Sequence, residues 1–137
     1  WLEDEVQNVD SYANVENYLI YGYYRQAIVH DGRFIGVSGL DLVSDKNKVA
    51  RFFIVIGRKE SWGKGIGSGV IKLIINYGFE ELKLRKINSD FLLPNEGVRI
   101  IHEKAGFKDE GILRKDSFRN NNWIDRKIVS IFSNEQE

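Results

Sequence analysis

The apolar residues change from a helical to a strand-like spacing about 24 residues into the chain. Residues 1–24 are polar, with apolar positions spaced as on one face of a helix. The dipeptide Asp31-Gly32 is typical of a tight hairpin turn between two strands. The pattern therefore predicts a helix and then three consecutive antiparallel strands, at 25–31, 33–43 and 48–56.

The second half of the chain alternates helical and strand patterns. Residues 68–81 are apolar over most of a helical circumference, which suits a helix buried against a sheet. Pro94 disfavours helical geometry at the residue before it, and Asn95 is a good N-cap. A second helix is therefore predicted to run from there to Ala105 and to stop at Gly106. The remaining apolar runs predict a strand at 84–93 and a closing hairpin at 111–119 and 123–133, turned by residues 120–122.

The predicted order is α-β-β-β-α-β-α-β-β, which indicates a single α/β (α+β) domain over residues 1–137. Its sheet is expected to be mixed and mostly antiparallel, flanked by two crossover helices. The chain contains 20 Lys plus Arg and 20 Asp plus Glu, so no basic field favours a nucleic-acid partner. No apolar run approaches the length of a membrane span.

Cysteine is absent, which excludes disulfides, thiolate metal sites and a cysteine nucleophile. We therefore expect a cytoplasmic protein without a metal. The chain begins at Trp1 rather than at a methionine, so we expect residues upstream of it to have been trimmed.

Four glycines on alternate positions separate the third strand from the helix behind it: Gly63, Gly65, Gly67 and Gly69. Glycines let a ligand approach backbone N–H groups closely, and a helix N-terminus attracts anions. The loop therefore predicts a phosphate site. The alternative is a glycine-rich turn that binds no ligand.

Two familiar phosphate loops do not fit this spacing. A Walker loop has four residues between its glycines and a hydroxyl residue after its lysine, whereas here five residues separate Gly57 from Gly63 and Gly65 follows Lys64. A dinucleotide fingerprint needs G-x-G-x-x-G at the start of a βαβ unit, and the alternate glycines break that pattern.

Three segments resemble the GCN5-related N-acetyltransferase (GNAT) superfamily. They are the loop WGKGIGSG at 62–69, the helix NEGVRIIHEKAGF at 95–107, and the closing hairpin from residue 110. Within the superfamily the chain is similar to the branch of ribosomal-protein, polyamine and amino-sugar acetyltransferases. The resemblance implies the GNAT fold, with its glycine loop after strand four, and an opening strand upstream of Trp1.

The resemblance implies acetyl-CoA as co-substrate and assigns residues to it. In such enzymes the fourth strand, which corresponds to the predicted strand at 48–56 of this chain, parts from the fifth strand. The backbone of the fourth strand then pairs with the pantetheine arm of the co-substrate. Asn95 would contact a pantetheine amide as well as cap its helix, and the Trp62 side chain would form one wall of the glycine loop. The strand residues are Ile54, Val55 and Ile56, and the pyrophosphate amides belong to Gly63, Lys64, Gly65, Ile66, Gly67 and Ser68.

His102 is a departure from the family pattern, because many relatives have a tyrosine there that is proposed to protonate the departing thiolate. An imidazolium is an acceptable donor at neutral pH. His102 is therefore expected to act as the acid, and the alternative is an exposed helix histidine without that role.

Arg51 is a second departure, since relatives often present a glutamate at its position. Arginine cannot act as a base. Either water or a carboxylate (Asp41, Asp90 or Asp116) deprotonates the amine, or Arg51 binds an acceptor that carries a phosphate or carboxylate. The alternative is an arginine on the solvated face of an ordinary strand. Arg51 and Asp41 are the expected substrate-binding residues.

The expected reaction is direct transfer of the acetyl group to a primary amine, with the Val55 N–H stabilising the oxyanion. Amino sugars, polyamines and protein N-termini are the candidate acceptors. The closing hairpin, with Phe118 and Trp123, is expected to form either part of the acceptor pocket or a homodimer contact. Two alternatives are an acetyl-CoA-binding sensor or partner module with impaired catalysis and, less favoured, a nucleotide-binding module.

Overall fold

The computed structural model describes residues 23–57 and 65–136, so the predicted N-terminal helix lies outside the described residues. The three predicted antiparallel strands are confirmed as β1 (Tyr24–His30), β2 (Arg33–Ser44) and β3 (Val49–Ile56). Asp31 and Gly32 both have positive φ, as a tight two-residue hairpin turn requires.

The two predicted helices are confirmed as α3 (Ile66–Glu80) and α4 (Glu96–Ala105), separated by the strand β4 (Lys86–Leu92). The Asn95 side chain accepts a hydrogen bond from the Val98 N–H at 3.2 Å and so caps α4. Gly106 ends α4 with a φ of 98°, a left-handed conformation in which glycine is least strained. Local capping residues thus place the ends of α4 where the sequence predicts them.

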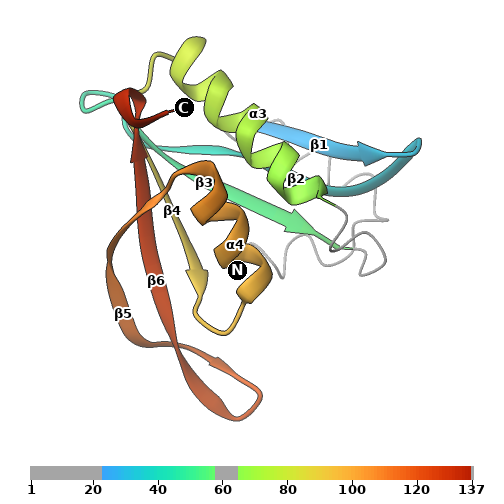
Figure 1. Ribbon diagram of the computed structural model, residues 1–137, viewed down its shortest axis with the longest axis vertical. Helices are drawn as coiled ribbons and strands as arrows, with labels where there is room; N and C mark the ends of the chain where they lie inside the picture. Colours follow the sequence, from blue (N-terminus) through green and yellow to red (C-terminus); the bar gives the residue numbers. More distant parts are fainter. Residues whose placement is uncertain (1–22, 58–64, 137) are drawn as a thin grey trace.

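The closing hairpin is longer than predicted. Its strands are β5 (Lys108–Arg119) and β6 (Asn122–Phe132), and a short 3₁₀ turn η2 (Ser133–Glu135) follows. Within the described residues the six strands form one sheet in the order β1-β2-β3-β4-β6-β5, and in that part of the chain only the β3–β4 pair is parallel. The mixed, mostly antiparallel sheet predicted from the sequence is therefore confirmed. In Figure 1 the β5–β6 hairpin extends well beyond the two helices.

The parallel pairing of β3 with β4 is short. It joins three residue pairs, from Val49↔Lys86 to Arg51↔Asn88, whereas β3 continues to Ile56 and β4 to Leu92. Beyond Arg51 the two strands diverge (Figure 1). We call this divergence the fork, and Phe52 is the first β3 residue inside it.

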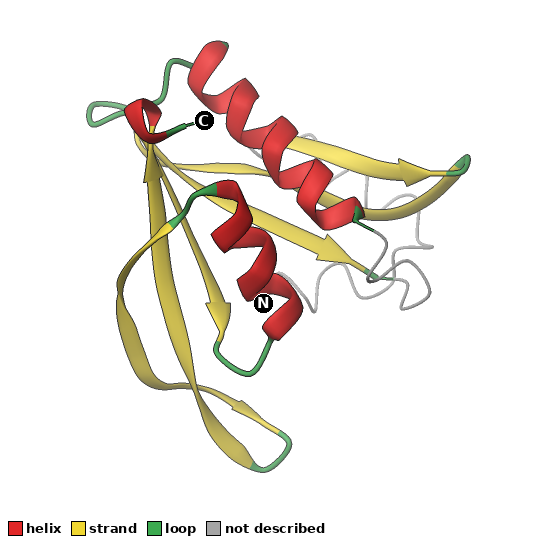
Figure 2. Ribbon diagram, viewed as in Figure 1, coloured by secondary structure: helices red, strands yellow, loops and turns green. Residues whose placement is uncertain are grey.

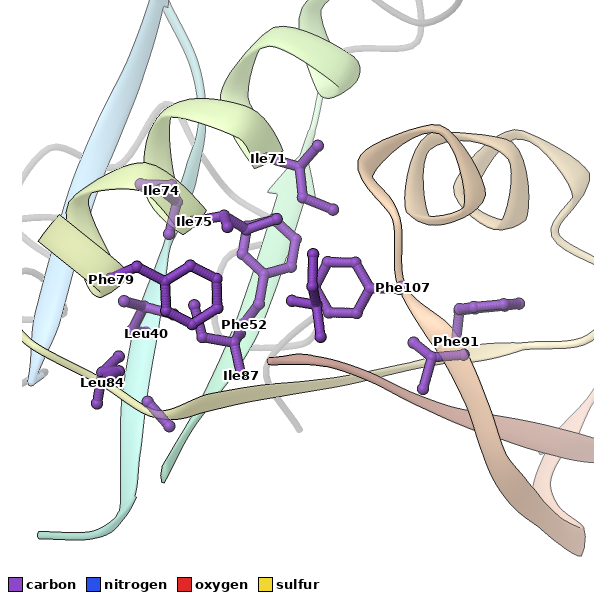
Figure 3. Close-up of a cluster of buried hydrophobic side chains, with 13 residues drawn as sticks. Leu40, Phe52, Ile71, Ile74, Ile75, Phe79, Leu84, Ile87, Phe91 and Phe107 are labelled. Atoms are coloured by element: carbon purple, nitrogen blue, oxygen red, sulfur yellow. The ribbon is translucent and has the colours of Figure 1, made fainter. Parts of the chain in front are cut away.

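Both helices cover the same face of the sheet (Figure 2). The core lies between them and the strands, and it joins α3 side chains such as Ile71 and Phe79 to Leu40, Phe52 and Ile87 of the sheet (Figure 3). Gly78 of α3 lets the helix approach the sheet, because a Cβ there would lie 3.0 Å from both Ile87 and Leu40. The packing holds the N-terminus of α3 beside the fork.

Candidate functional site

The first turn of α3 is the described part of the predicted phosphate loop. Gly65 is its N-cap with a φ of 76°, it has no side chain that could cap the turn, and the turn contains no acidic residue. Among the described residues, the N-cap therefore leaves the N–H groups of Ile66, Gly67 and Ser68 without a side-chain cap at the positive end of the helix dipole, which suits an anion. Trp62, Gly63 and Lys64 lie outside the described residues.

Gly67 also has a packing role. A Cβ on Gly67 would lie 3.3 Å from the Ile101 Cδ1 atom of α4, so the absence of a side chain lets the two helices pack closely. The glycines of the loop thus differ in function: Gly65 supplies a left-handed cap, and Gly67 supplies space.

Gly65 and Gly69 form a matched pair for a stability test. A Cβ would meet nothing within 4 Å at either position, but only Gly65 has a positive φ. We expect Gly65→Ala to lower the free energy of unfolding by about 1–2 kcal/mol through backbone strain. Gly69→Ala should instead raise it by roughly 0.5–1 kcal/mol, because alanine is a better helix former. Urea unfolding measures both, and an equal effect of the two substitutions would contradict this interpretation.

The backbone direction of β3 corrects one sequence prediction. Gly57 N–H donates to the Ile35 carbonyl of β2 at 2.9 Å. Backbone groups alternate sides along a strand, so Val55 also faces β2, opposite its partner Val37. A Cβ on Gly36 would lie 2.1 Å from the Val55 carbonyl oxygen, which agrees with that direction. The prediction that the Val55 N–H serves the fork is therefore wrong, and the backbone of Ile54 and Ile56 faces the fork instead.

His102 does not lie on the helix surface. Its side chain is 2% exposed and packs among the rings of Phe52, Phe91 and Phe107, with ring centroids 5.1–5.9 Å away. The alternative of an exposed helix histidine is therefore wrong. Ring nitrogen Nδ1 lies 2.8 Å from the Val98 carbonyl, and Nε2 lies 2.7 Å from the Ser89 hydroxyl.

This environment weighs against the predicted acid role of His102. Burial lowers the pKa of His102, and the hydrogen bond to the Val98 carbonyl and the charge of Asp90 oppose that effect only in part. A histidine that is neutral at pH 7 holds its single ring proton at Nδ1, against Val98, and carries none at Nε2. The surroundings of His102 therefore give the predicted acid role no support.

Arg51 belongs to a charged network on the sheet face opposite the helices. Its guanidinium binds Asp90 through two hydrogen bonds, of 2.7 and 3.2 Å. Arg126 donates to the same carboxylate at 2.7 Å and to Asp116 at 2.8 Å. Among the described residues, Arg51 and Arg126 are thus paired with the carboxylates of Asp90 and Asp116, an arrangement that does not favour the predicted role of Arg51 in binding an acidic acceptor.

The three candidate carboxylate bases each contact an arginine. Asp41 accepts from Arg25 at 2.9 Å, and Asp90 and Asp116 belong to the network described above. Burial by itself would raise the pKa of Asp90, but hydrogen bonds and charges from Arg51 and Arg126 outweigh it and lower the pKa below its ordinary value. The lowered pKa makes Asp90 a weaker base than an ordinary aspartate, and Asp41 and Asp116 are each engaged in an ion pair with an arginine.

Two residues near the fork were missed from the sequence, Ser89 and Arg126. Ser89 is buried on β4 at an inward position between Ile87 and Phe91, and this polar residue in an apolar alternation was the available signal. No comparable signal marked Arg126, which is 36 positions from Asp90 in the chain.

The described residues contain neither a metal site nor a membrane helix. Within 23–57 and 65–136, no three His, Asp or Glu side chains gather in a way that could hold a metal ion. No helix in that part of the chain is long and apolar enough to cross a membrane.

Comparison with known proteins assigns the chain to a family. Residues 2–108 match the family model of the acetyltransferase (GNAT) domain. The chain belongs to the GNAT acetyltransferase family. The predicted superfamily is thereby confirmed.

Curated GNAT relatives come from several bacteria. The probable N-acetyltransferase YjcK of Bacillus subtilis is 34% identical over 107 residues, which cover 78% of this chain and 59% of that protein. The spermidine N(1)-acetyltransferase of Vibrio cholerae is 28% identical over 134 residues, covering 96% of this chain and 77% of that protein. The chain spans 54–60% of the length of three of the curated Bacillus subtilis relatives that it matches.

Solved GNAT structures share the fold. A probable acetyltransferase has a TM-score of 0.79 and 26% identity, covering 96% of this chain and 74% of that one. The Vibrio cholerae spermidine N-acetyltransferase in complex with CoA and spermine has a TM-score of 0.76 and 26% identity, covering 92% of this chain and 76% of that one. The predicted GNAT fold is thereby confirmed.

Proposed function

We propose that this GNAT protein transfers the acetyl group of acetyl-CoA directly to a primary amine. The observation that carries the proposal is the fork: β3 and β4 pair over three residues and then part, beside the N-terminus of α3, whose N-cap is a glycine without a capping side chain. The pantetheine arm of acetyl-CoA is extended and could pair with a free strand backbone, and its pyrophosphate would be attracted by the positive end of a helix. Acetyl-CoA supplies the activated thioester.

In this proposal the chain binds and orients rather than reacting covalently. The first turn of α3 holds the pyrophosphate through the amides of Ile66, Gly67 and Ser68. The Ile54 backbone faces the fork, so its N–H is assigned to the thioester carbonyl oxygen in place of the Val55 N–H. Asn95, at the N-terminus of α4, has amide donors left over after capping and is assigned to a pantetheine carbonyl.

The proposed chemical step is one displacement. The amine, after losing a proton to water, forms a bond from its nitrogen to the acetyl carbon, and the carbon–sulfur bond breaks. The thiolate leaves and takes a proton from water, and the amide nitrogen loses its second proton to water. No residue of the chain is covalently modified.

For the acceptor we propose a small primary amine, and a polyamine as the first to test. Two solved neighbours are spermidine N-acetyltransferases of Vibrio cholerae, and one of them was solved in complex with CoA and spermine. Among the described residues, the carboxylates of Asp90 and Asp116 pair with Arg51 and Arg126, so these four side chains do not by themselves select the charge of the acceptor. An amino sugar and a peptide N-terminus are the comparison substrates.

A cytoplasmic location and a homodimer stay predictions. Phe118 and Trp123 support the homodimer, because their rings meet edge to face on the hairpin although the side chains are 56% and 62% exposed.

An acceptor screen tests the proposed function. The protein is incubated with acetyl-CoA and with spermidine, an amino sugar or an N-terminal peptide, and release of the CoA thiol is followed. We expect release that requires both the protein and an amine. Acetyl-CoA binding by calorimetry without release for any amine would overturn the proposal and favour the impaired acetyl-CoA-binding module.

A further inference from the structure

A polar ring, that of His102, lies at the base of the fork. It reaches from α4 into the space where β3 and β4 part, and its ring contacts Phe52 of β3, Phe91 of β4 and Phe107 after α4. All three partners belong to the buried core. A polar ring in such surroundings requires hydrogen-bond partners for both nitrogens.

The partners of His102 determine the direction of its hydrogen bonds. The Val98 carbonyl, 2.8 Å from Nδ1, can only accept, so Nδ1 carries the proton. Nε2 is then an acceptor, and the Ser89 hydroxyl donates to it at 2.7 Å. The Ser89 oxygen also lies 3.4 Å from the Phe52 carbonyl, the first carbonyl of β3 past the last β3–β4 pair. The single hydroxyl proton of Ser89 goes to Nε2, so its approach to the Phe52 carbonyl is a contact rather than a second hydrogen bond. Ser89 therefore links α4 to β4 through a hydrogen bond and contacts β3 at the same point.

We propose that Ser89 and His102 form a positioning pair that sets how far β3 and β4 part, and hence where the Ile54 N–H lies. His102 fills the base of the fork, and its hydrogen bond to Ser89 holds α4 in register with β4. The inference rests on the proposed function, because that function places the reacting carbonyl in the fork. In this proposal His102 positions the strands and does not transfer a proton to the thiolate.

Nuclear magnetic resonance tests the pair without any turnover. In the wild-type protein, ¹⁵N spectra should show His102 as the neutral Nδ1–H form across about pH 5 to 8, the range in which an ordinary histidine titrates. Ser89→Ala should shift both the His102 Nε2 resonance and the Ile54 amide resonance. Ser130→Ala is the control, since Ser130 is a buried sheet serine that donates to Glu110 at 2.6 Å instead. A charged His102 or an unmoved Ile54 amide in Ser89→Ala would overturn the proposal.

Two substitutions of His102 separate positioning from acid catalysis. Glutamine can place an acceptor where Nε2 lies, and asparagine can place its polar atoms only where Nδ1 lies. We expect His102→Asn and Ser89→Ala each to lower kcat about 10-fold by misplacing the reacting groups, and the double variant to lose no more than either. His102→Gln, which keeps the Ser89 contact, should recover most of the loss.

Different results would overturn the positioning pair and the proposed acetyl transfer. If His102 were the acid, His102→Gln and His102→Asn would lose the same activity and Ser89→Ala would lose little, and that result would overturn the positioning pair. If the wild-type protein released no thiol with any amine, the proposed function would fail, whereas the resonance measurements would still decide the pair.

Discussion

An ester oxygen in place of the Ile54 peptide N–H is expected to lower kcat about 100- to 1,000-fold, the effect of removing one donor from an oxyanion site. The Ile54 backbone faces the fork, so the exchange leaves the side chain and the β2–β3 hydrogen bonds in place. The affinity for acetyl-CoA should change little, because this N–H is assigned to the carbonyl oxygen, on which charge develops only during the reaction. Backbone ester incorporation followed by thiol-release kinetics and calorimetry measures both quantities.

The same exchange at Val55 is the matched control. Val55 faces β2 opposite Val37, so its ester should remove a sheet hydrogen bond and lower the free energy of unfolding by about 1 kcal/mol. A loss of turnover at Val55 without one at Ile54 would restore the oxyanion role that the sequence alone suggested for Val55.

Asp90→Ala is expected to give the largest loss of stability, about 3 kcal/mol in the free energy of unfolding. The Asp90 side chain is only 12% exposed and joins two guanidiniums, so its removal leaves two neighbouring positive charges without the carboxylate between them. Asp116→Ala is the control, because that carboxylate is 37% exposed and should cost less than about 1 kcal/mol. Equal losses from urea unfolding would contradict the central position of Asp90 in the network.

The lowered pKa of Asp90 also predicts how stability depends on pH. In the unfolded chain its pKa is about 3.9, and in the folded protein it is lower, so the folded state favours the charged carboxylate. The stabilisation is therefore fully present above about pH 4 and is lost as the pH falls through the folded pKa. Asp90→Asn should flatten the fall in unfolding free energy below about pH 4, and an unchanged slope would show that Asp90 makes no such contribution.

The arrangement of the elements could be predicted from the sequence because local signals specify it. The turn at Asp31-Gly32, the cap at Asn95 and the stop at Gly106 each depend on the backbone geometry of one or two residues, and all three lie where they were expected. The closing hairpin begins earlier than expected, at Lys108 rather than near residue 111, because pairing with β6 extends β5 past the local pattern.

The site residues likewise divide into those that local sequence signals specify and those that the tertiary structure places. The sequence by itself determined the family, the glycine loop and the departures at Arg51 and His102, since these are properties of residue type and spacing. Only the tertiary structure decided that Ile54 rather than Val55 faces the fork, that His102 is buried against Ser89, and that Asp90 joins Arg51 to Arg126. Strand direction and ion pairing depend on neighbours that are distant in the chain, and no local pattern records which neighbours the fold brings together.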